Sequence, residues 1–297
     1  MKSVKSLKNT EARLKFGANT FIWESPFSTE KHLYLLDKVR QMGFDLLEVA
    51  VEEPALVDVA ALRRAAQAAG VGIIVCGAFG PERNLSSADE TIRQNAAAYL
   101  GWLIDAAAEL ESPVVAGPMY SAVGKERLAT AVSRQQEWDR AVAGLQKWGA
   151  YAEQRGVRLA MEPLNRFEND VINIVDQGLA LIEAVGCTAV GLHLDTFHMH
   201  LEEKDSAAAI RRAAAHIFHV HACENDRGVP GTGQVNWQGV AQALSDVDYQ
   251  GAVVIESFTP QVQSIARAVC IWREIAPSQD SIAADGLAFL QGIMGRR

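Results

Sequence analysis

Short apolar runs alternate along the chain with longer stretches, rich in alanine and leucine, whose apolar positions recur at helical spacing. Such alternation is typical of repeated strand–helix units. The expected strands are Phe16–Thr20, Leu46–Ala50, Gly72–Gly77, Pro113–Gly117, Arg158–Glu162, Val190–Asp195, Ile217–His221 and Ala252–Glu256. The expected helices are Ser28–Met42, Val57–Ala69, Ala88–Leu110, Ala129–Gln154, Gln177–Val185, Ser206–Ala214, Trp237–Ser245 and Asp280–Ile293. Strict alternation without a break in composition predicts an α/β fold, a single (β/α)8 TIM barrel.

The composition limits the partners that the protein can bind. The chain has 297 residues, of which 49% are hydrophobic and 22% charged, and its formal net charge is −8. A surface that binds nucleic acid or an anionic membrane needs a basic face, and lysine and arginine are scattered here. We therefore expect no nucleic-acid or membrane partner, and a small, weakly charged substrate fits better.

The N-terminal segment carries no targeting pattern. No apolar run approaches the roughly 20 residues that cross a bilayer, and residues 1–15 lack the apolar core of a signal peptide. The sequence thus predicts a cytoplasmic protein with an N-terminal extension over 1–15 and the barrel over 16–297.

Metal-binding side chains occur at the ends of four successive expected strands. Glu162 lies in LAMEPLNRFEN, Asp195 in VGLHLDTFHM, His221 in HIFHVHACEND and Glu256 in AVVIESF. Each follows the one before by about one strand–helix unit, and barrel enzymes carry their chemistry at the C-terminal strand ends. Three carboxylates and one imidazole suit Mn²⁺, Mg²⁺ or Co²⁺ better than structural zinc. The alternative is that Glu162 and Glu256 only cap the following loops.

The four cysteines, Cys76, Cys187, Cys223 and Cys270, are far apart and form no CxxC pair. This spacing argues against a zinc knuckle or a disulfide framework. Cys223 would lie on the same side of an extended segment as His221. Because a soft thiolate matches three carboxylates poorly as a co-ligand, we expect Cys223 to be a packed thiol.

A divalent ion between these side chains would bind a hydroxyketone and stabilise the enediolate that forms when a proton is removed. Glu162 and Glu256 are the predicted proton-transfer residues, because their strands approach the ion from different directions. If they act on opposite faces of the planar intermediate, the carbon is inverted. If both transfers use one face, or the proton returns to the neighbouring carbon, the result is an aldose–ketose isomerisation.

Further polar residues follow the ligands and are placed to contact a sugar. Glu168, His198 and Arg227 are expected in loops at the same mouth as candidates for binding sugar hydroxyls, the alternative being ion pairs or solvated loops. Arg227 could also hold an enediolate oxygen through its guanidinium. Phe21 and Trp23, after the first strand, predict either a pocket wall or core packing.

The strings EPLNRFEN, LDTFHM, HACENDRGVPGTGQVNW and VVIESF resemble the motifs of the ketose 3-epimerases of the xylose isomerase-like TIM barrel superfamily. This group includes D-tagatose 3-epimerase, D-allulose (psicose) 3-epimerase and L-ribulose 3-epimerase. The resemblance runs from about Phe16 to the C-terminal helix. It implies that Glu162 and Glu256 are both metal ligands and proton-transfer residues, and that Asp195 and His221 complete the ligand set.

The resemblance also implies the substrate and the cofactor. It implies substrate contacts by Glu168, His198 and Arg227, a Mn²⁺ cofactor with Co²⁺ or Mg²⁺ as substitutes, and a homodimer or homotetramer. The implied substrates are free ketoses such as D-tagatose, D-allulose, D-fructose or L-ribulose. In two places the chain departs from the family pattern: Ser257 stands where many members have proline, and Ala222-Cys223 stands where Thr-Gly or a similar pair is frequent. Neither departure removes a functional group, and both change the surroundings of the ligands.

Two other functions remain open from the sequence. An aldose–ketose or inosose isomerase would use the same metal site, whereas a non-catalytic sugar-binding protein would use a degenerate barrel. Both glutamates are intact, which favours an enzyme. A nuclease of the same superfamily would need more histidine ligands and a basic surface, and the chain has 7 histidines.

Overall fold

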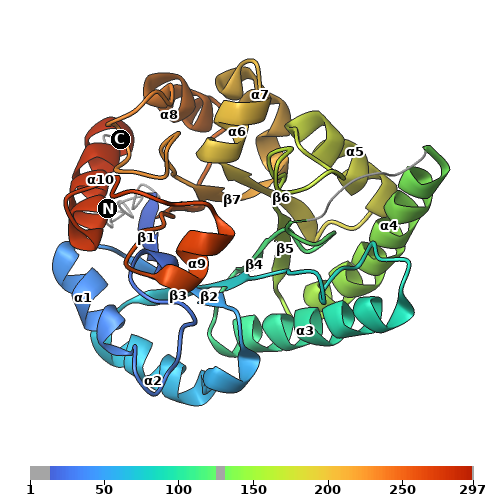
Figure 1. Cartoon of the computed structure of the whole chain (residues 1–297), viewed down its shortest axis with the longest axis horizontal. Coiled ribbons are helices and arrows are strands. Elements are labelled where there is room, and N and C mark those ends of the chain that lie inside the picture. The colour runs from blue at the N-terminus through green and yellow to red at the C-terminus, as the bar shows by residue number, and fades with distance from the viewer. Residues whose placement is uncertain (1–13, 125–130, 296–297) are drawn as a thin grey trace, which may run out of the picture.

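The computed structural model describes residues 14–124 and 131–295, so residues 1–13 of the expected N-terminal extension lie outside the described part. Within it, the parallel strands close into one barrel in the order β1 to β8, with β8 paired to β1 (Figure 1). The strands are β1 Lys15–Asn19, β2 Leu46–Val51, β3 Gly72–Gly77, β4 Val114–Gly117, β5 Arg158–Met161, β6 Val190–Asp195, β7 Ile217–His221 and β8 Ala252–Ile255. The predicted (β/α)8 barrel is confirmed.

Helices surround the barrel and connect its strands (Figure 1). The α-helices are α1 Tyr34–Met42, α2 Val59–Ala69, α3 Glu90–Glu109, α4 Ala131–Gln154, α5 Val175–Val185, α6 Thr196–Glu202, α7 Ser206–Ala213, α8 Trp237–Asp246, α9 Gln263–Ala268 and α10 Gln279–Met294. Short 3₁₀ helices are η1 Thr20–Ile22, η2 Pro54–Leu56 and η3 Ala214–His216. Among the described residues, no helix is both long enough and apolar enough to span a membrane.

Helix α1 begins at Tyr34, later than the start at Ser28 that the sequence predicted. The preceding residues are held in turns instead. The backbone N–H of Ser28 donates to Nδ1 of His32 at 3.1 Å, and that of Thr29 donates to the carbonyl oxygen of Leu56 at 3.0 Å. A segment tied to the β2–α2 connection in this way cannot supply the first helical turn.

Helix α6 was not predicted, because it follows β6 without an intervening loop. Asp195 is both the last residue of β6 and the N-cap of α6, and its Oδ1 accepts the backbone N–H of Phe197 at 2.7 Å. An acidic N-cap of this kind satisfies one of the free N–H groups of the first turn. The helix therefore starts at the barrel mouth and carries His198 there, where a loop was expected.

The barrel interior changes from apolar to polar toward the C-terminal ends of β2 and β8. Leu46 and Val254 belong to the apolar cluster inside the barrel. Two residues later along the chain, Glu48 on β2 and Glu256 directly after β8 are buried acids. Because alternate residues of a strand face the same side, these acids point into the same interior. The fold thus places buried acids inside the barrel next to a layer of apolar side chains.

Candidate metal centre

The four residues predicted as metal ligands lie together at the C-terminal mouth of the barrel. Glu162 directly follows β5, Asp195 and His221 end β6 and β7, and Glu256 directly follows β8. Their relative exposures range from 0% to 7%. Nδ1 of His221 lies 3.6 Å from Oε2 of Glu256 and 4.0 Å from Oδ2 of Asp195. Candidate ligand atoms of Asp195, His221 and Glu256 all lie within 4.8 Å of one another, as do those of Glu162 and Asp195.

The electrostatics of this cluster fit a divalent cation. Nδ1 of His221 is buried without a hydrogen-bond partner among the described residues. Burial raises the pKa of Glu162 well above its usual value, and the charges of Glu256 and Asp195 raise it further, although His221 opposes them. A cation held here would give the unpartnered nitrogen a bond and would neutralise the crowded carboxylates. Oxygen ligands with one imidazole suit Mn²⁺, Co²⁺ or Mg²⁺.

Arg227 lies inside the ligand cluster, deeper than a loop position would suggest. Its Nη1 is 2.8 Å from Oδ2 of Asp195 and 2.9 Å from Oε2 of Glu256. The guanidinium also lies over the ring of Phe197, 3.9 Å from the centroid. Burial raises the pKa of Asp195, but the positive charges of Arg227, His198 and His221 and the hydrogen bond from Phe197 together outweigh it, so that pKa lies below its usual value. Arg227 is thus a fixed positive charge between two predicted ligands.

His198 and Glu168, predicted to contact substrate, lie beside this cluster. Nδ1 of His198 accepts the backbone N–H of Asn165 at 3.0 Å, so the proton of the neutral ring resides on Nε2. That Nε2 lies 3.7 Å from Oε1 of Glu162. Burial lowers the pKa of His198. Oε1 of Glu168 accepts a hydrogen bond from the Asn165 side chain at 2.8 Å. Asn165 therefore fixes both side chains relative to the mouth.

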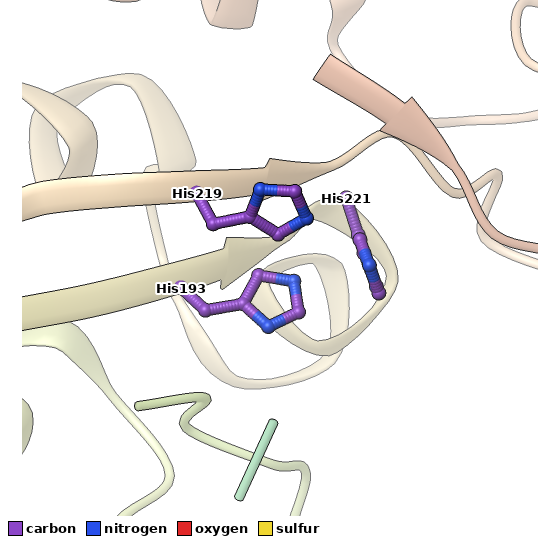
Figure 2. A group of neighbouring side chains, drawn as sticks. All are labelled: His193, His219 and His221. Atoms are coloured by element: carbon purple, nitrogen blue, oxygen red, sulfur yellow. The ribbon is translucent and has the colours of Figure 1, made fainter. Parts of the chain in front are cut away.

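Two histidines that the sequence reasoning missed lie one step deeper in the barrel. His193 and His219 precede Asp195 and His221 by two residues on β6 and β7, and both are fully buried. Figure 2 shows their rings extending from neighbouring strands toward the ring of His221. The ring centroids of His193 and His221 are 4.0 Å apart. The spacing of two residues along each strand was the signal that could have revealed them.

Glu48 of β2 lies under the same histidines. Its Oε1 is 2.6 Å from Nε2 of His221, and its Oε2 is 2.6 Å from Nε2 of His219. Nδ2 of Asn19 donates to Oε1 at 2.7 Å. Burial raises the pKa of Glu48, but positive charge on His221 and His219 outweighs it, so the pKa lies below its usual range. A single acid in the apolar strand LLEVAV was the sequence signal for this residue.

The two aromatic residues after β1 have different surroundings. Trp23 belongs to the main hydrophobic core, and its Nε1 donates to Oδ1 of Asp280 at 2.7 Å. Phe21 packs on Phe258, with ring centroids 5.5 Å apart. The guanidinium of Arg227 lies 5.0 Å from the centroid of Phe258. Core packing thus describes Trp23, whereas Phe21 supports a ring that borders the cluster.

Cys223 is buried next to the predicted ligands. Its Sγ lies 3.1 Å from the carbonyl oxygen of Glu256 and 3.4 Å from Oδ2 of Asp195, so the single S–H can donate to one of these oxygens, and Sγ accepts from Nη1 of Arg227 at 3.0 Å. Burial raises the pKa of Cys223 well above its usual value, and the charge of Asp195 raises it further. The surroundings therefore favour a packed, protonated thiol.

Comparisons with known proteins give the family of this chain. The model of the xylose isomerase-like TIM barrel family matches residues 36–292. A probable ketose 3-epimerase of Synechocystis sp. is 35% identical over 94% of this chain and 96% of its own length. A solved L-ribulose 3-epimerase is 31% identical and superposes with a TM-score of 0.90 over 95% of both chains. A D-psicose 3-epimerase from Clostridium cellulolyticum, solved with D-tagatose, is 31% identical and has a TM-score of 0.86 over 95% of this chain and 99% of its own.

The family assignment thus rests on sequence and on fold over nearly the whole chain. The acids and the imidazole that the family resemblance marked lie together at one mouth. The chain belongs to the xylose isomerase-like TIM barrel family and, within it, to the ketose 3-epimerases, which are enzymes of the isomerase class.

Proposed function

We propose that this protein is a divalent-metal-dependent ketose 3-epimerase that acts on free ketohexoses or ketopentoses. D-Tagatose, D-allulose, D-fructose and L-ribulose are the candidate substrates, in keeping with the D-tagatose in the solved psicose 3-epimerase. The chain's formal net charge of −8 agrees with an uncharged sugar as substrate.

The placement of Glu162 and Glu256 carries this proposal. Glu162 lies beside residues of β6 and α6, with its carboxylate 3.7 Å from both His193 and His198. Glu256 lies beside residues that end or follow β7, 3.6 Å from His221 and 2.9 Å from Arg227. The two acids have different neighbours and flank the β6–β7 strand ends from either side. A flat sugar intermediate between them would meet one acid on each face.

Metal binding and proton transfer have separate roles in the proposed epimerisation. A bound divalent cation, held by Glu162, Asp195, His221 and Glu256, would polarise the ketone and stabilise negative charge on the sugar oxygens. One glutamate removes the proton from C3, and the other returns a proton on the opposite face. The roles of the two glutamates exchange when the reaction runs backward.

The remaining polar residues orient the sugar. The guanidinium of Arg227 presents several donors toward developing negative charge on oxygen. His198, whose proton is on Nε2, donates toward the side of Glu162. Glu168 accepts from a sugar hydroxyl at the mouth, where Asn165 holds its carboxylate in place. These contacts keep C3 between the two acids.

Mn²⁺ is the proposed cofactor, with Co²⁺ or Mg²⁺ as substitutes. Three carboxylates supply hard oxygen ligands, and the single imidazole favours a transition-metal ion over Ca²⁺. Turnover of EDTA-treated protein reconstituted with each ion in turn would rank them, and higher turnover with Zn²⁺ or Ca²⁺ than with Mn²⁺ would contradict the choice.

Deuterium incorporation tests the reaction. Incubation of D-tagatose or D-allulose with the Mn²⁺-loaded protein in D₂O should place deuterium at C3 and form the C3 epimer. An aldose–ketose or inosose isomerase on the same site would instead label a neighbouring carbon and, for aldoses, give an aldehyde. A sugar-binding protein would label nothing with any ketose, and that result would overturn the proposal.

A further inference from the structure

The two ring nitrogens of His221 have different surroundings in this structure. Nε2 forms a 2.6 Å hydrogen bond with Oε1 of Glu48, deep in the barrel. Nδ1 has no hydrogen-bond partner among the described residues and faces Glu256 and Asp195 at 3.6 and 4.0 Å. Only an unprotonated nitrogen can bind a metal ion. The position of the proton on this ring therefore decides whether the ligand atom is available.

Glu48 has the chemistry to fix that proton. As a carboxylate it can only accept hydrogen bonds, so the ring nitrogen that faces it must carry a hydrogen. Glu48 is fully buried, and burial removes water as an alternative partner for its oxygens. A carboxylate behind a metal-bound histidine sets the tautomer and the ring orientation in many metal sites.

Glu48 is itself held by Asn19, its register partner on the neighbouring strand β1. Nδ2 of Asn19 donates to its Oε1 at 2.7 Å. Oδ1 of Asn19 in turn accepts the backbone N–H of Phe21 at 2.9 Å, which caps η1. The amide of Asn19 is therefore fixed in one orientation, with its NH₂ group toward Glu48. This chain of contacts joins β1 and β2 to the end of β7.

An alternative is that the deeper histidines form a second metal site with His221. His193, His219 and His221 each offer a nitrogen within 4.8 Å of the others. The contacts of Glu48 favour hydrogen bonding here, because its Oε1 forms a 2.6 Å hydrogen bond with Nε2 of His221 and its Oε2 lies 2.6 Å from Nε2 of His219 as an ion-pair contact. Two ligand atoms that each lie about 2.0–2.3 Å from a shared ion are usually farther apart than the 2.6 Å between Glu48 and these histidines. Nδ1 of His221 lies 3.6 Å from Glu256 and 4.0 Å from Asp195, and both distances leave room for an ion between the atoms.

We propose that Glu48 is a positioning residue that keeps Nε2 of His221 protonated and so directs the electron pair of Nδ1 at the metal centre. The proposal rests on the metal site of the proposed function. Glu48 is outside the candidate ligand groups, and its proposed effect on the metal centre runs through His221.

Three substitutions at Glu48 separate the contributions of side-chain volume, hydrogen bonding and charge to Mn²⁺ affinity. Glu48→Met keeps the volume but removes the acceptor, and we expect Mn²⁺ affinity to fall about 10- to 100-fold. Glu48→Gln keeps a carbonyl oxygen that can accept from both Asn19 and His221, so it should retain most of the affinity. Glu48→Asp keeps the charge but draws it away from His221, and it should behave like Glu48→Met. This variant also serves if the Met variant does not fold.

The readouts are Mn²⁺ affinity by titration calorimetry and the proton signal on Nε2 of His221. The signal is measured by NMR on Mg²⁺-loaded protein labelled with ¹⁵N-histidine, because Mg²⁺ is diamagnetic. We expect a strongly downfield signal in the wild type and Glu48→Gln, and its loss or upfield shift in Glu48→Met. In a His221→Ala background, the same changes at Glu48 should have no further effect on affinity.

A matched control for Glu48→Met is Glu224→Met, which also replaces a fully buried carboxylate by an apolar side chain. Glu224 accepts from Nε1 of Trp237 and from backbone N–H groups but contacts no histidine in the described residues. The control substitution should lower the melting temperature and leave Mn²⁺ affinity unchanged. Equal loss of affinity in this control would show that Glu48 acts through general destabilisation.

The possible results distinguish this inference from the proposed function. If the wild-type protein does not bind Mn²⁺, the proposed function fails. If the wild type binds Mn²⁺ and Glu48→Met binds it equally well, the role of Glu48 is refuted. Two ions per chain in the wild type, one of them lost in Glu48→Met, would assign the deeper histidines to a second metal site and overturn the proposal.

Discussion

Nη1 of Arg227 lies 2.8 Å from Oδ2 of Asp195, so a side-chain cation is inserted among the residues predicted to hold a metal ion. The same nitrogen lies 2.9 Å from Oε2 of Glu256. All three groups are almost completely buried. Without the guanidinium, two buried carboxylates would lie close together, and among the described residues the imidazoles of His221 and His198 would be left to offset their charge.

Replacement of Arg227 should therefore destabilise the metal-free protein. Removing one partner of a buried ion pair typically costs about 3–5 kcal/mol, and we expect Arg227→Met to lose an amount of this order. Arg227→Lys, which keeps the charge without the planar fork, should lose less. Urea unfolding of EDTA-treated protein measures the difference. Saturating Mn²⁺ should reduce it, and equal stability of Arg227→Met and wild type would contradict this account.

Glu162→Gln and Glu256→Gln should each lower turnover by about 10²- to 10⁴-fold, because each removes one of two proton-transfer groups. The two variants should differ in exchange. Each should still exchange deuterium into the one epimer whose proton is taken by the remaining glutamate, without forming the other epimer. Optical rotation measures turnover, and NMR of each epimer in D₂O measures exchange. Near-normal turnover in either variant would exclude the assignment of two proton-transfer groups.

Metal binding should raise thermal stability. An ion present at 100 times its dissociation constant stabilises the folded state by about 2.7 kcal/mol, which corresponds to a rise of several degrees in melting temperature. Differential scanning calorimetry of EDTA-treated protein with and without Mn²⁺ measures the shift. Asp195 belongs both to the group with His221 and Glu256 and to the group with Glu162, so Asp195→Ala should show little shift in melting temperature when Mn²⁺ is added. A shift of equal size in that variant would place the ion elsewhere.

Cys223→Ser should leave Mn²⁺ affinity and turnover close to the wild type. The thiol lies 3.1 Å from the carbonyl oxygen of Glu256, where it can donate a hydrogen bond, and burial raises its pKa, so we expect it to remain a thiol and not to become a thiolate ligand. The Co²⁺-loaded wild-type protein should accordingly lack a sulfur-to-cobalt charge-transfer band. Appearance of that band, and its loss in Cys223→Ser, would make Cys223 a ligand.

Glu224 should contribute stability that is lost in acid. Burial raises its pKa, but hydrogen bonds from Trp237 and from backbone N–H groups outweigh this and place the pKa below the usual value of 4.5. A group whose pKa is depressed in the folded state stabilises the protein above its unfolded pKa and loses that contribution as pH falls through the folded pKa. The stability difference between wild type and Glu224→Gln should therefore shrink below about pH 4.5. Urea midpoints from pH 7 to pH 3 measure it, and a constant difference would refute the role.

The sequence predicted those features that depend on local periodicity. The bounds of β6 and β7 agree with the expected strands, so Asp195 and His221 were correctly placed at strand ends. Helix α6 could not be predicted in this way, because Asp195 ends one element and caps the next without a loop. The start of α1 was also wrong, since residues before Tyr34 are fixed by contacts with a distant segment.

The deeper residues of the site required the three-dimensional fold. Glu48 and His221 are 173 positions apart in the chain, and only closure of the barrel brings them to 2.6 Å. Arg227 was expected near the sugar, but its insertion between Asp195 and Glu256 depends on a left-handed backbone conformation with φ of 64°. Such a conformation is uncommon for an arginine and is not evident from the residue type.

The two carboxylate oxygens of Asp195 have different partners. Oδ1 closes the first turn of α6, whereas Oδ2 faces Arg227 and His221. One side chain therefore joins the N-terminus of α6, the helix that carries Phe197 and His198, to the candidate metal ligands. Any substitution of Asp195 removes the cap of this helix together with a candidate ligand, so both changes occur in a single variant.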